Sequence, residues 1–242
     1  MNLRKKEENK MRELIGKSVL DVVRHLPALT WDLTEDGRVT REKIEQLIFI
    51  YYQWKKPKTE DELFKHISAD NLDLGFIEKE SERGVGLTSL VKLRNPEDYI
   101  GPRFGNIPFI DFDTCGKFDF LSETDLLELM KSQIRDVTEL ERGFILRSSS
   151  KGNYHFIGTG RLFNENDFVT FLNVCLLMRY KTSDRDIGLV DARHIGHALT
   201  PMKHLAELNS GWSMYDINTK FSTLRVSSRQ NPAYEVVDVL GE

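Results

Sequence analysis

The chain has 242 residues, of which 40% are hydrophobic and 30% are charged, so it can bury a core and has the composition of an ordinary soluble globular protein. Its formal net charge of -4 argues against a protein that coats nucleic acid through bulk charge, but it leaves room for a local basic groove. The two cysteines, Cys115 and Cys175, cannot form a disulfide framework or a structural zinc site, so we expect oxygen atoms to hold any metal.

The chain contains no apolar run that resembles a secretory signal or a segment able to span a bilayer. We therefore expect a soluble protein without a membrane partner. The expected compartment is the reducing cytoplasm, with association to the nucleoid, or the nucleus if the source is a eukaryote.

The first hundred residues carry mostly helical patterns. Apolar residues recur at three- and four-residue steps over residues 9–24 and again over residues 44–54. A capping box, Thr-Glu-Asp-Glu, begins a third helical pattern at Thr59. Residues 82–106 are rich in Gly and Pro and predict an irregular connector. These patterns predict a mainly helical N-terminal lobe over residues 1–104.

Strands alternate with helices in the rest of the chain. Period-two and short apolar patterns predict strands over residues 107–113, 144–148, 154–157, 187–191, 223–227 and 234–239. Helical patterns cover residues 122–135 and 167–180, and another helix begins at Thr200. Residues 105–242 are therefore predicted to be an α/β or α+β lobe, which forms one compact unit with the first.

Two aspartates lie close together in the strand predicted over residues 107–113. Side chains alternate faces along a strand, so Asp111 and Asp113 point to one side while Ile110 and Phe112 point to the other. Two ionised carboxylates without an adjacent Lys or Arg repel each other. A bound Mg²⁺ or Mn²⁺ would relieve this repulsion by accepting oxygen ligands from both. The pair therefore predicts a divalent-metal site.

Three classes of enzyme use such an Asp-x-Asp motif. The haloacid-dehalogenase-like phosphotransferases require Thr or Val two residues after the second Asp, where this chain has Cys115, and place the motif in the first strand of their fold. Glycosyltransferases use the motif to hold a metal against a nucleotide diphosphate, and no other segment decides for or against them. The third class is favoured by the segments that follow.

A small basic turn joins the strands predicted over residues 144–148 and 154–157. It contains Lys151 and Gly152, and His155 follows in the second strand. Backbone amides and a lysine in such a turn can bind phosphate oxygens, with the histidine close by. Ser-Lys-Gly is also a common hairpin tip, so the turn alone leaves both interpretations open.

Three motifs, taken in order, resemble the catalytic core of the archaeo-eukaryotic primases and primase-polymerases. That core combines a hydrophobic strand ending in Asp-x-Asp, a small residue-x-His strand often preceded by Ser-x-Lys-Gly, and a hydrophobic residue followed by Asp. The chain offers Phe109-Ile110-Asp111-Phe112-Asp113, then Ser149-Ser150-Lys151-Gly152-Asn153-Tyr154-His155, then Leu189-Val190-Asp191. The resemblance covers roughly residues 105–230.

The resemblance implies a two-lobed core in which an RRM-like C-terminal sheet bears the site and the helical N-terminal lobe closes over it. Asp111, Asp113 and Asp191 would be the catalytic residues and would hold the metal, two Mg²⁺ or Mn²⁺ ions. The residues implied to bind the nucleotide are Ser149, Ser150, Lys151, Gly152, His155 and Arg225. Among these, His155 would contact the phosphates of the incoming nucleotide.

The implied activity is that of a DNA-directed nucleotidyltransferase, a primase or DNA polymerase. It would add nucleotides from an NTP or dNTP to a 3′-hydroxyl on a single-stranded or primed DNA template, or on RNA. Proteins of replication or repair would be its further partners.

Basic residues near the C-terminus have simpler alternatives. Arg225 alternates with apolar neighbours and resembles a late strand position that meets nucleotide or template, although an exposed strand arginine would show the same pattern. Arg193, His194 and His197 follow Asp191, and the two histidines have the spacing of a helical metal pair. Without a carboxylate or thiol at matching spacing, we predict a structural role for them.

Two features of many related enzymes are missing from this sequence. Two isolated cysteines cannot make the zinc-binding segment of many primases, and no Walker-type motif indicates a fused helicase. The sequence therefore supports nucleotidyl transfer more directly than primer synthesis. The alternatives are a non-catalytic module of the same fold that binds single-stranded nucleic acid, and a metal-dependent nuclease or other phosphotransferase.

Overall fold

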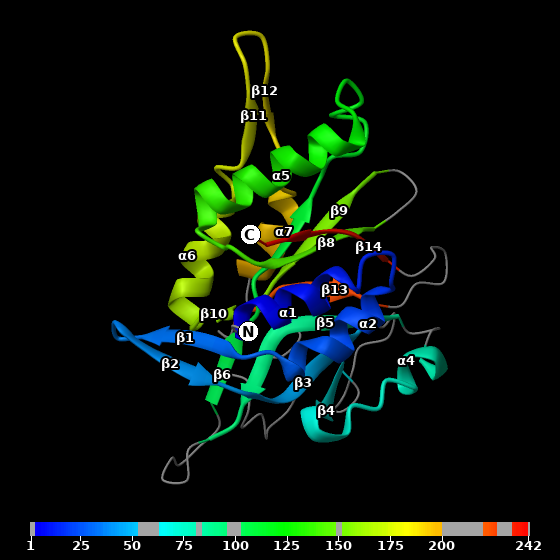
Figure 1. The fold of residues 1–242 in the computed structure, drawn as a ribbon, viewed down its shortest axis with the longest axis vertical. Coiled ribbons are helices and arrows are strands. Elements are labelled where there is room, and N and C mark those ends of the chain that lie inside the picture. Colours follow the sequence, from blue (N-terminus) through cyan, green and yellow to red (C-terminus); the bar gives the residue numbers. More distant parts are fainter. Residues whose placement is uncertain are drawn as a thin grey trace.

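Helices and strands alternate through the computed structural model (Figure 1). The structure describes residues 3–52, 63–80, 84–95, 103–148, 152–199, 220–226 and 234–241. The helices are α1 (Leu3–Arg12), α2 (Val19–His25), α4 (Phe76–Lys79), α5 (Glu123–Thr138), α6 (Glu165–Cys175) and α7 (Ala192–Leu199), with short 3₁₀ helices at Leu26–Ala28 and Ala69–Asn71. The strands are β1 (Trp31–Glu35), β2 (Arg38–Glu42), β3 (Ile44–Tyr51), β4 (Phe64–Ser68), β5 (Val85–Leu93), β6 (Arg103–Asn106), β7 (Phe109–Phe112), β8 (Gly143–Arg147), β9 (Tyr154–Gly158), β10 (Arg161–Leu162), β11 (Arg179–Lys181), β12 (Asp186–Gly188), β13 (Thr223–Arg225) and β14 (Glu235–Leu240).

The first sheet is antiparallel and has the strand order β14-β8-β9-β7. Its chain order, β7–α5–β8–β9–α6, places α5 and α6 on one face, where Ile110 and Phe112 pack with both helices in one core. Phe109 points to the opposite face and belongs to a different core. The alternation predicted for β7 is therefore confirmed, and Asp111 shares the Phe109 face.

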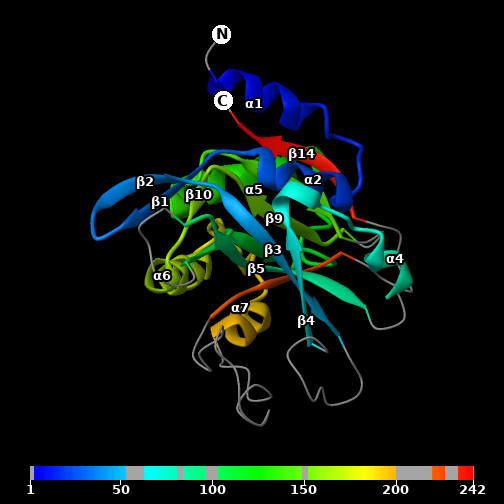
Figure 2. The same ribbon diagram turned by 90° about the horizontal axis from the view of Figure 1, so that it is seen from below.

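The second sheet has the order β13-β5-β3-β4, with β6 also paired to β5. It shares a hydrophobic core with the first sheet, since Phe49 and Leu87 from one sheet pack in the same cluster as Phe144 and Ile157 from the other. Figure 2 shows α1 against β14 at one side of the molecule and α7 at the other. The hairpin of β11 and β12 projects at one end (Figure 1), and β1, β2 and β10 form a small third sheet.

The helix predicted over residues 44–54 is wrong, because Ile44–Tyr51 forms β3 in the second sheet. Both faces of β3 are buried: Leu47 and Phe49 pack in the core shared with the first sheet, while Ile48 and Ile50 pack in a separate core behind it. A strand buried on both faces is apolar at nearly every position, so it also contains the three- and four-residue steps of a helix.

The prediction of a mainly helical N-terminal lobe is also wrong, since α1 and α2 are followed by the strands β1 to β5. The irregular connector over residues 82–106 is also wrong, because it contains β5 and β6. Gly86 does not mark a turn there. A Cβ at Gly86 would lie 2.6 Å from the Tyr52 hydroxyl oxygen, so the glycine allows a close approach within a strand.

Most elements predicted in the second half are confirmed. Strands β7, β8, β9, β13 and β14 lie where they were predicted, and Ser122 caps α5 by accepting a hydrogen bond from the Asp125 amide. The helix predicted over residues 167–180 ends earlier, because β11 begins at Arg179. The helix predicted from Thr200 lies outside the described residues.

The protein has a mixed α and β fold, as predicted. The division into lobes at residues 104 and 105 stays a prediction, and residues on both sides of it share one core.

Candidate metal and nucleotide site

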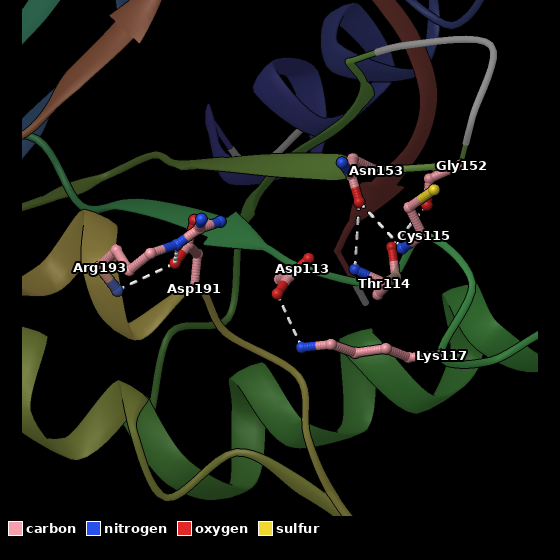
Figure 3. Close-up of polar contacts among 8 residues, drawn as sticks. All are labelled: Asp113, Thr114, Cys115, Lys117, Gly152, Asn153, Asp191 and Arg193. Atoms are coloured by element: carbon pink, nitrogen blue, oxygen red, sulfur yellow. Dashed lines mark hydrogen bonds and ion pairs between the residues drawn. The ribbon is translucent and has the colours of Figure 1, made fainter.

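Asp111 lies near the end of β7, beside the segment that leads into α7. The Asp191 amide donates to the Asp111 carbonyl oxygen, and the Asp113 amide donates to the Leu189 carbonyl oxygen, both at 2.9 Å. The strand predicted over residues 187–191 is thus divided between β12 and a segment paired with β7. Through these bonds the three aspartates predicted as a set lie on adjoining stretches of backbone, and Figure 3 shows two of them beside the end of β7.

The Asp111 carboxylate lies between two imidazoles. Its Oδ1 is 3.2 Å from His155 Nδ1, and its Oδ2 is 3.6 Å from His194 Nδ1. Burial raises the pKa of Asp111 to about 6, His194 opposes this change, and the negative charges of Asp191 and Asp113 add to it. The ionised carboxylate is therefore poorly compensated by the protein, and a bound cation would relieve that cost.

Asp113 and Asp191 each carry a basic partner instead. Asp113 Oδ2 is 2.7 Å from Lys117 Nζ, and the Arg193 guanidinium donates to both Asp191 oxygens at 3.1 Å. Asp191 also caps α7, because its Oδ1 accepts from the Arg193 amide at 2.9 Å and its carbonyl oxygen accepts from the Ile195 amide. Burial acts to raise the pKa of Asp191, but the hydrogen bonds and charge of Arg193 outweigh it, so this pKa is lowered.

With these side-chain positions, no group of three or more His, Cys, Asp or Glu residues in the described part of the chain is arranged to hold a metal ion. In Figure 3 the Asp113 and Asp191 oxygens turn toward Lys117 and Arg193. Both basic side chains are exposed, and exposed ion pairs contribute only about 0–1 kcal/mol, so a divalent ion can displace them. In chemical type, though not in these side-chain positions, three carboxylates match the oxygen ligands that Mg²⁺ and Mn²⁺ prefer.

The turn predicted to bind phosphate is only partly described. Ser149, Ser150 and Lys151 lie outside the described residues. The Gly152 carbonyl oxygen accepts from the Thr114 hydroxyl at 2.5 Å, and Asn153 Oδ1 accepts from the amides of Thr114 and Cys115 at 3.2 and 2.9 Å (Figure 3). The end of this turn is therefore hydrogen-bonded to the loop that follows β7.

A hollow of about 370 Å³ lies between this loop and the start of α5. Cys115 and Gly116 form part of one wall, and Arg147 and Tyr154 form part of another. Glu123 binds both of the latter, accepting from the Tyr154 hydroxyl at 2.8 Å. The volume is in the range of small-molecule sites, and the hollow adjoins the turn at Gly152.

His155 and Arg225 complete the residues predicted from sequence. His155 pairs with Asp111 in the register of β9 and β7, and its ring centroid is 5.1 Å from that of Tyr234. Burial, helped by the positive charge of Arg225, lowers the pKa of His155 to about 4, so the ring is neutral at neutral pH. Arg225 is exposed, with its guanidinium 5.2 Å from the centroid of the Tyr52 ring. Their roles in nucleotide binding stay predictions.

No family model matches the chain. No curated protein and no solved structure matches it either. No helix in the ranges that the structure describes is long and apolar enough to cross a membrane. The interpretation of the site therefore rests on its own geometry.

Ser222 was not among the site residues predicted from the sequence, and His194 was predicted to have only a structural role. His194 faces Asp111 with one ring nitrogen, and its Nε2 is hydrogen-bonded to Ser222 Oγ. The only signal in the sequence was that His194 lies three residues after Asp191, one of the predicted metal ligands. His197, one turn further along, is exposed, and the structural role predicted for it stays a prediction.

Proposed function

We propose that this chain is a metal-dependent nucleotidyltransferase of the primase-polymerase type, which adds nucleotides from an NTP or dNTP to a 3′-hydroxyl on a nucleic-acid template. The proposal is carried by the backbone hydrogen bonds that hold Asp191 beside Asp111 and Asp113. Motifs that are distant in sequence converge in space, and His155, from the middle motif, lies opposite Asp111. This convergence supports the set of residues that the resemblance implies.

Phosphoryl transfer requires mainly positioning and neutralisation of charge. Bound Mg²⁺ or Mn²⁺ would supply charge neutralisation at the attacking and leaving oxygens. The single N–H of the neutral His155 ring faces the Asp111 carboxylate, so His155 would donate to a phosphate oxygen only after taking up a second proton beside the phosphate charge, while Arg225 supplies a positive charge nearby. Because Arg225 belongs to β13, the proposed site uses side chains from both sheets.

The test is incorporation of labelled nucleotides on primed and unprimed single-stranded templates with Mg²⁺ or Mn²⁺. We expect incorporation by the wild type and a loss of at least about 100-fold for Asp111→Asn and for Asp113→Asn, because metal stabilisation is worth several kcal/mol. Asp136→Asn is the matched control, since Asp136 is an exposed carboxylate on α5 that accepts from Ser132. It should retain wild-type incorporation.

Other outcomes distinguish the alternatives. Consumption of the DNA instead of the nucleotide would indicate a nuclease. Salt-sensitive binding of single strands that needs no metal, with no incorporation, would indicate the non-catalytic module. Either result, or undiminished incorporation by the double variant of Asp111 and Asp113, would refute the proposal.

A further inference from the structure

A chain of polar contacts runs from Asp111 into the second sheet. His194 Nδ1 lies 3.6 Å from Asp111 Oδ2, and His194 Nε2 is hydrogen-bonded to Ser222 Oγ. The Ser222 amide donates to Ser89 Oγ, and the Ser89 hydroxyl donates to Asn106 Oδ1, both at 2.9 Å. Strand β7 of the first sheet, which carries Asp111, is thus connected to β5 and β6 of the second sheet.

The far end of this chain is fixed. Ser89, Asn106 and Ser222 are at most 2% exposed, and the Ser89 amide also donates to the Ser222 carbonyl oxygen at 2.8 Å. Buried polar groups that have partners are held in place, because leaving any of them unpaired costs about 1–3 kcal/mol. Ser222 therefore offers His194 a hydroxyl whose position is set by the second sheet.

The proton positions follow from the partners. At 3.6 Å the contact between His194 Nδ1 and Asp111 is electrostatic rather than a hydrogen bond, and it is favourable for an ionised Asp111 when the ring carries its proton on Nδ1. The other nitrogen, Nε2, then accepts from the Ser222 hydroxyl. Ser222 thus selects the form of the ring that presents an N–H to the carboxylate.

The same connectivity, Ser222 to His194 to Asp111, resembles that of a hydrolytic triad. Ser222 is only 1% exposed, so its oxygen cannot reach a substrate. The imidazole therefore acts on the carboxylate rather than on a nucleophile.

We propose that His194 is a positioning residue that holds the Asp111 carboxylate in the orientation needed to bind the metal, and that Ser222 holds His194. The inference rests on the proposed function, because it assumes that Asp111 is a metal ligand. Groups that orient a ligand in this way contribute about 10- to 100-fold to metal affinity.

The test measures metal binding rather than turnover. Free Mn²⁺ would be followed by electron paramagnetic resonance, and Mg²⁺ by competition, for wild type, His194→Asn, His194→Gln and Ser222→Ala. Asn places its amide N–H near the position of Nδ1, whereas Gln places it near Nε2. We expect Gln and the Ser222 variant to weaken both metals by about 10- to 100-fold, and Asn to remain closest to wild type.

The matched control is His197→Gln, on the same helix, which should bind like the wild type. Circular dichroism would identify variants that fail to fold, and the Asn and Gln variants keep the test valid if Ser222→Ala is among them. Equal binding by wild type and His194→Gln would overturn the inference, and so would a loss confined to Mn²⁺, which would make His194 a direct ligand. If the wild type itself binds neither metal, the proposed function fails first and the inference with it.

Discussion

Asp111 and Asp113 are two residues apart in the same segment, but their surroundings differ. Asp111 faces two imidazoles whose pKa values are lowered, mainly by burial, so neither ring places a full positive charge against it at neutral pH. Asp113 faces the ammonium group of Lys117, which is 42% exposed. Asp111 is therefore contacted by neutral rings that do not cancel its charge, whereas Asp113 is paired with an exposed cation. In the proposed metal site, Asp111 would be the more fixed ligand and Asp113 the more adjustable one.

The largest effect expected from this difference is on stability. The pKa of Asp111 is raised from 3.8 to about 6, so folding favours its protonated form, and stability falls as pH rises from about 4 to about 6. Above that range the full penalty applies, up to about 3 kcal/mol for two pKa units. In metal-free buffer near pH 8, Asp111→Asn should therefore raise the free energy of unfolding by up to this amount.

Urea unfolding in EDTA at pH 4 and pH 8 measures this effect. The gain should disappear at pH 4, where Asp111 is already largely protonated. Asp113→Asn is the comparison, and because it removes only an exposed ion pair, its change should stay within about 1 kcal/mol. A lower stability of Asp111→Asn than of wild type at pH 8 would break the contrast between the two carboxylates.

A smaller effect is expected at Asp191, which contributes to stability as the cap of α7. Asp191→Ala should lower the free energy of unfolding by about 1 kcal/mol, because the Arg193 amide loses its acceptor. Asp191→Asn retains a side-chain oxygen for the cap and should lose less. Urea unfolding at pH 7 compares them, and equal losses would show that the ion pair with Arg193, rather than the cap, supplies the stability.

The smallest effect concerns the cation beside Asp113. If Lys117 competes with the metal, Lys117→Met should strengthen Mn²⁺ binding by about two- to fivefold, which corresponds to an exposed ion pair of at most about 1 kcal/mol. Lys131→Met is the control, because Lys131 pairs with Asp238 outside the site. Weaker binding by the Lys117 variant would mean that the lysine supports the metal site rather than occupying it.

Local periodicity explains which parts could be predicted. Strand β7 carries Ile110 and Phe112 on one face and Phe109 and Asp111 on the other, and the polar residue on the second face made its alternation readable from the sequence. Strand β3 has two apolar faces, because each packs in a different core, and its pattern could not be told from that of a helix. The helical N-terminal prediction failed at this point.

The candidate site likewise has one part that could be predicted from the sequence and one part that could not. The resemblance placed Asp191 with the strand aspartates, and the backbone bonds are consistent with that grouping. The contact between His194 and Ser222 joins segments that come together only when the two sheets pack, so no local pattern predicts it. Asn153 shows another contact that no local pattern predicts. The primase motif favours a small residue at its position, but here the side-chain oxygen of Asn153 accepts hydrogen bonds from the loop after β7.

These hydrogen bonds place a thiol where it is experimentally useful. Cys115, whose amide donates to Asn153, is exposed, whereas Cys175 is buried and burial raises the pKa of its thiol. The chain has only these two cysteines, so a maleimide fluorophore would attach at Cys115 alone, without any mutation. The label would lie where the loop after β7, the turn at Gly152 and the hollow meet, and its emission would test the proposed nucleotide binding without altering any other residue.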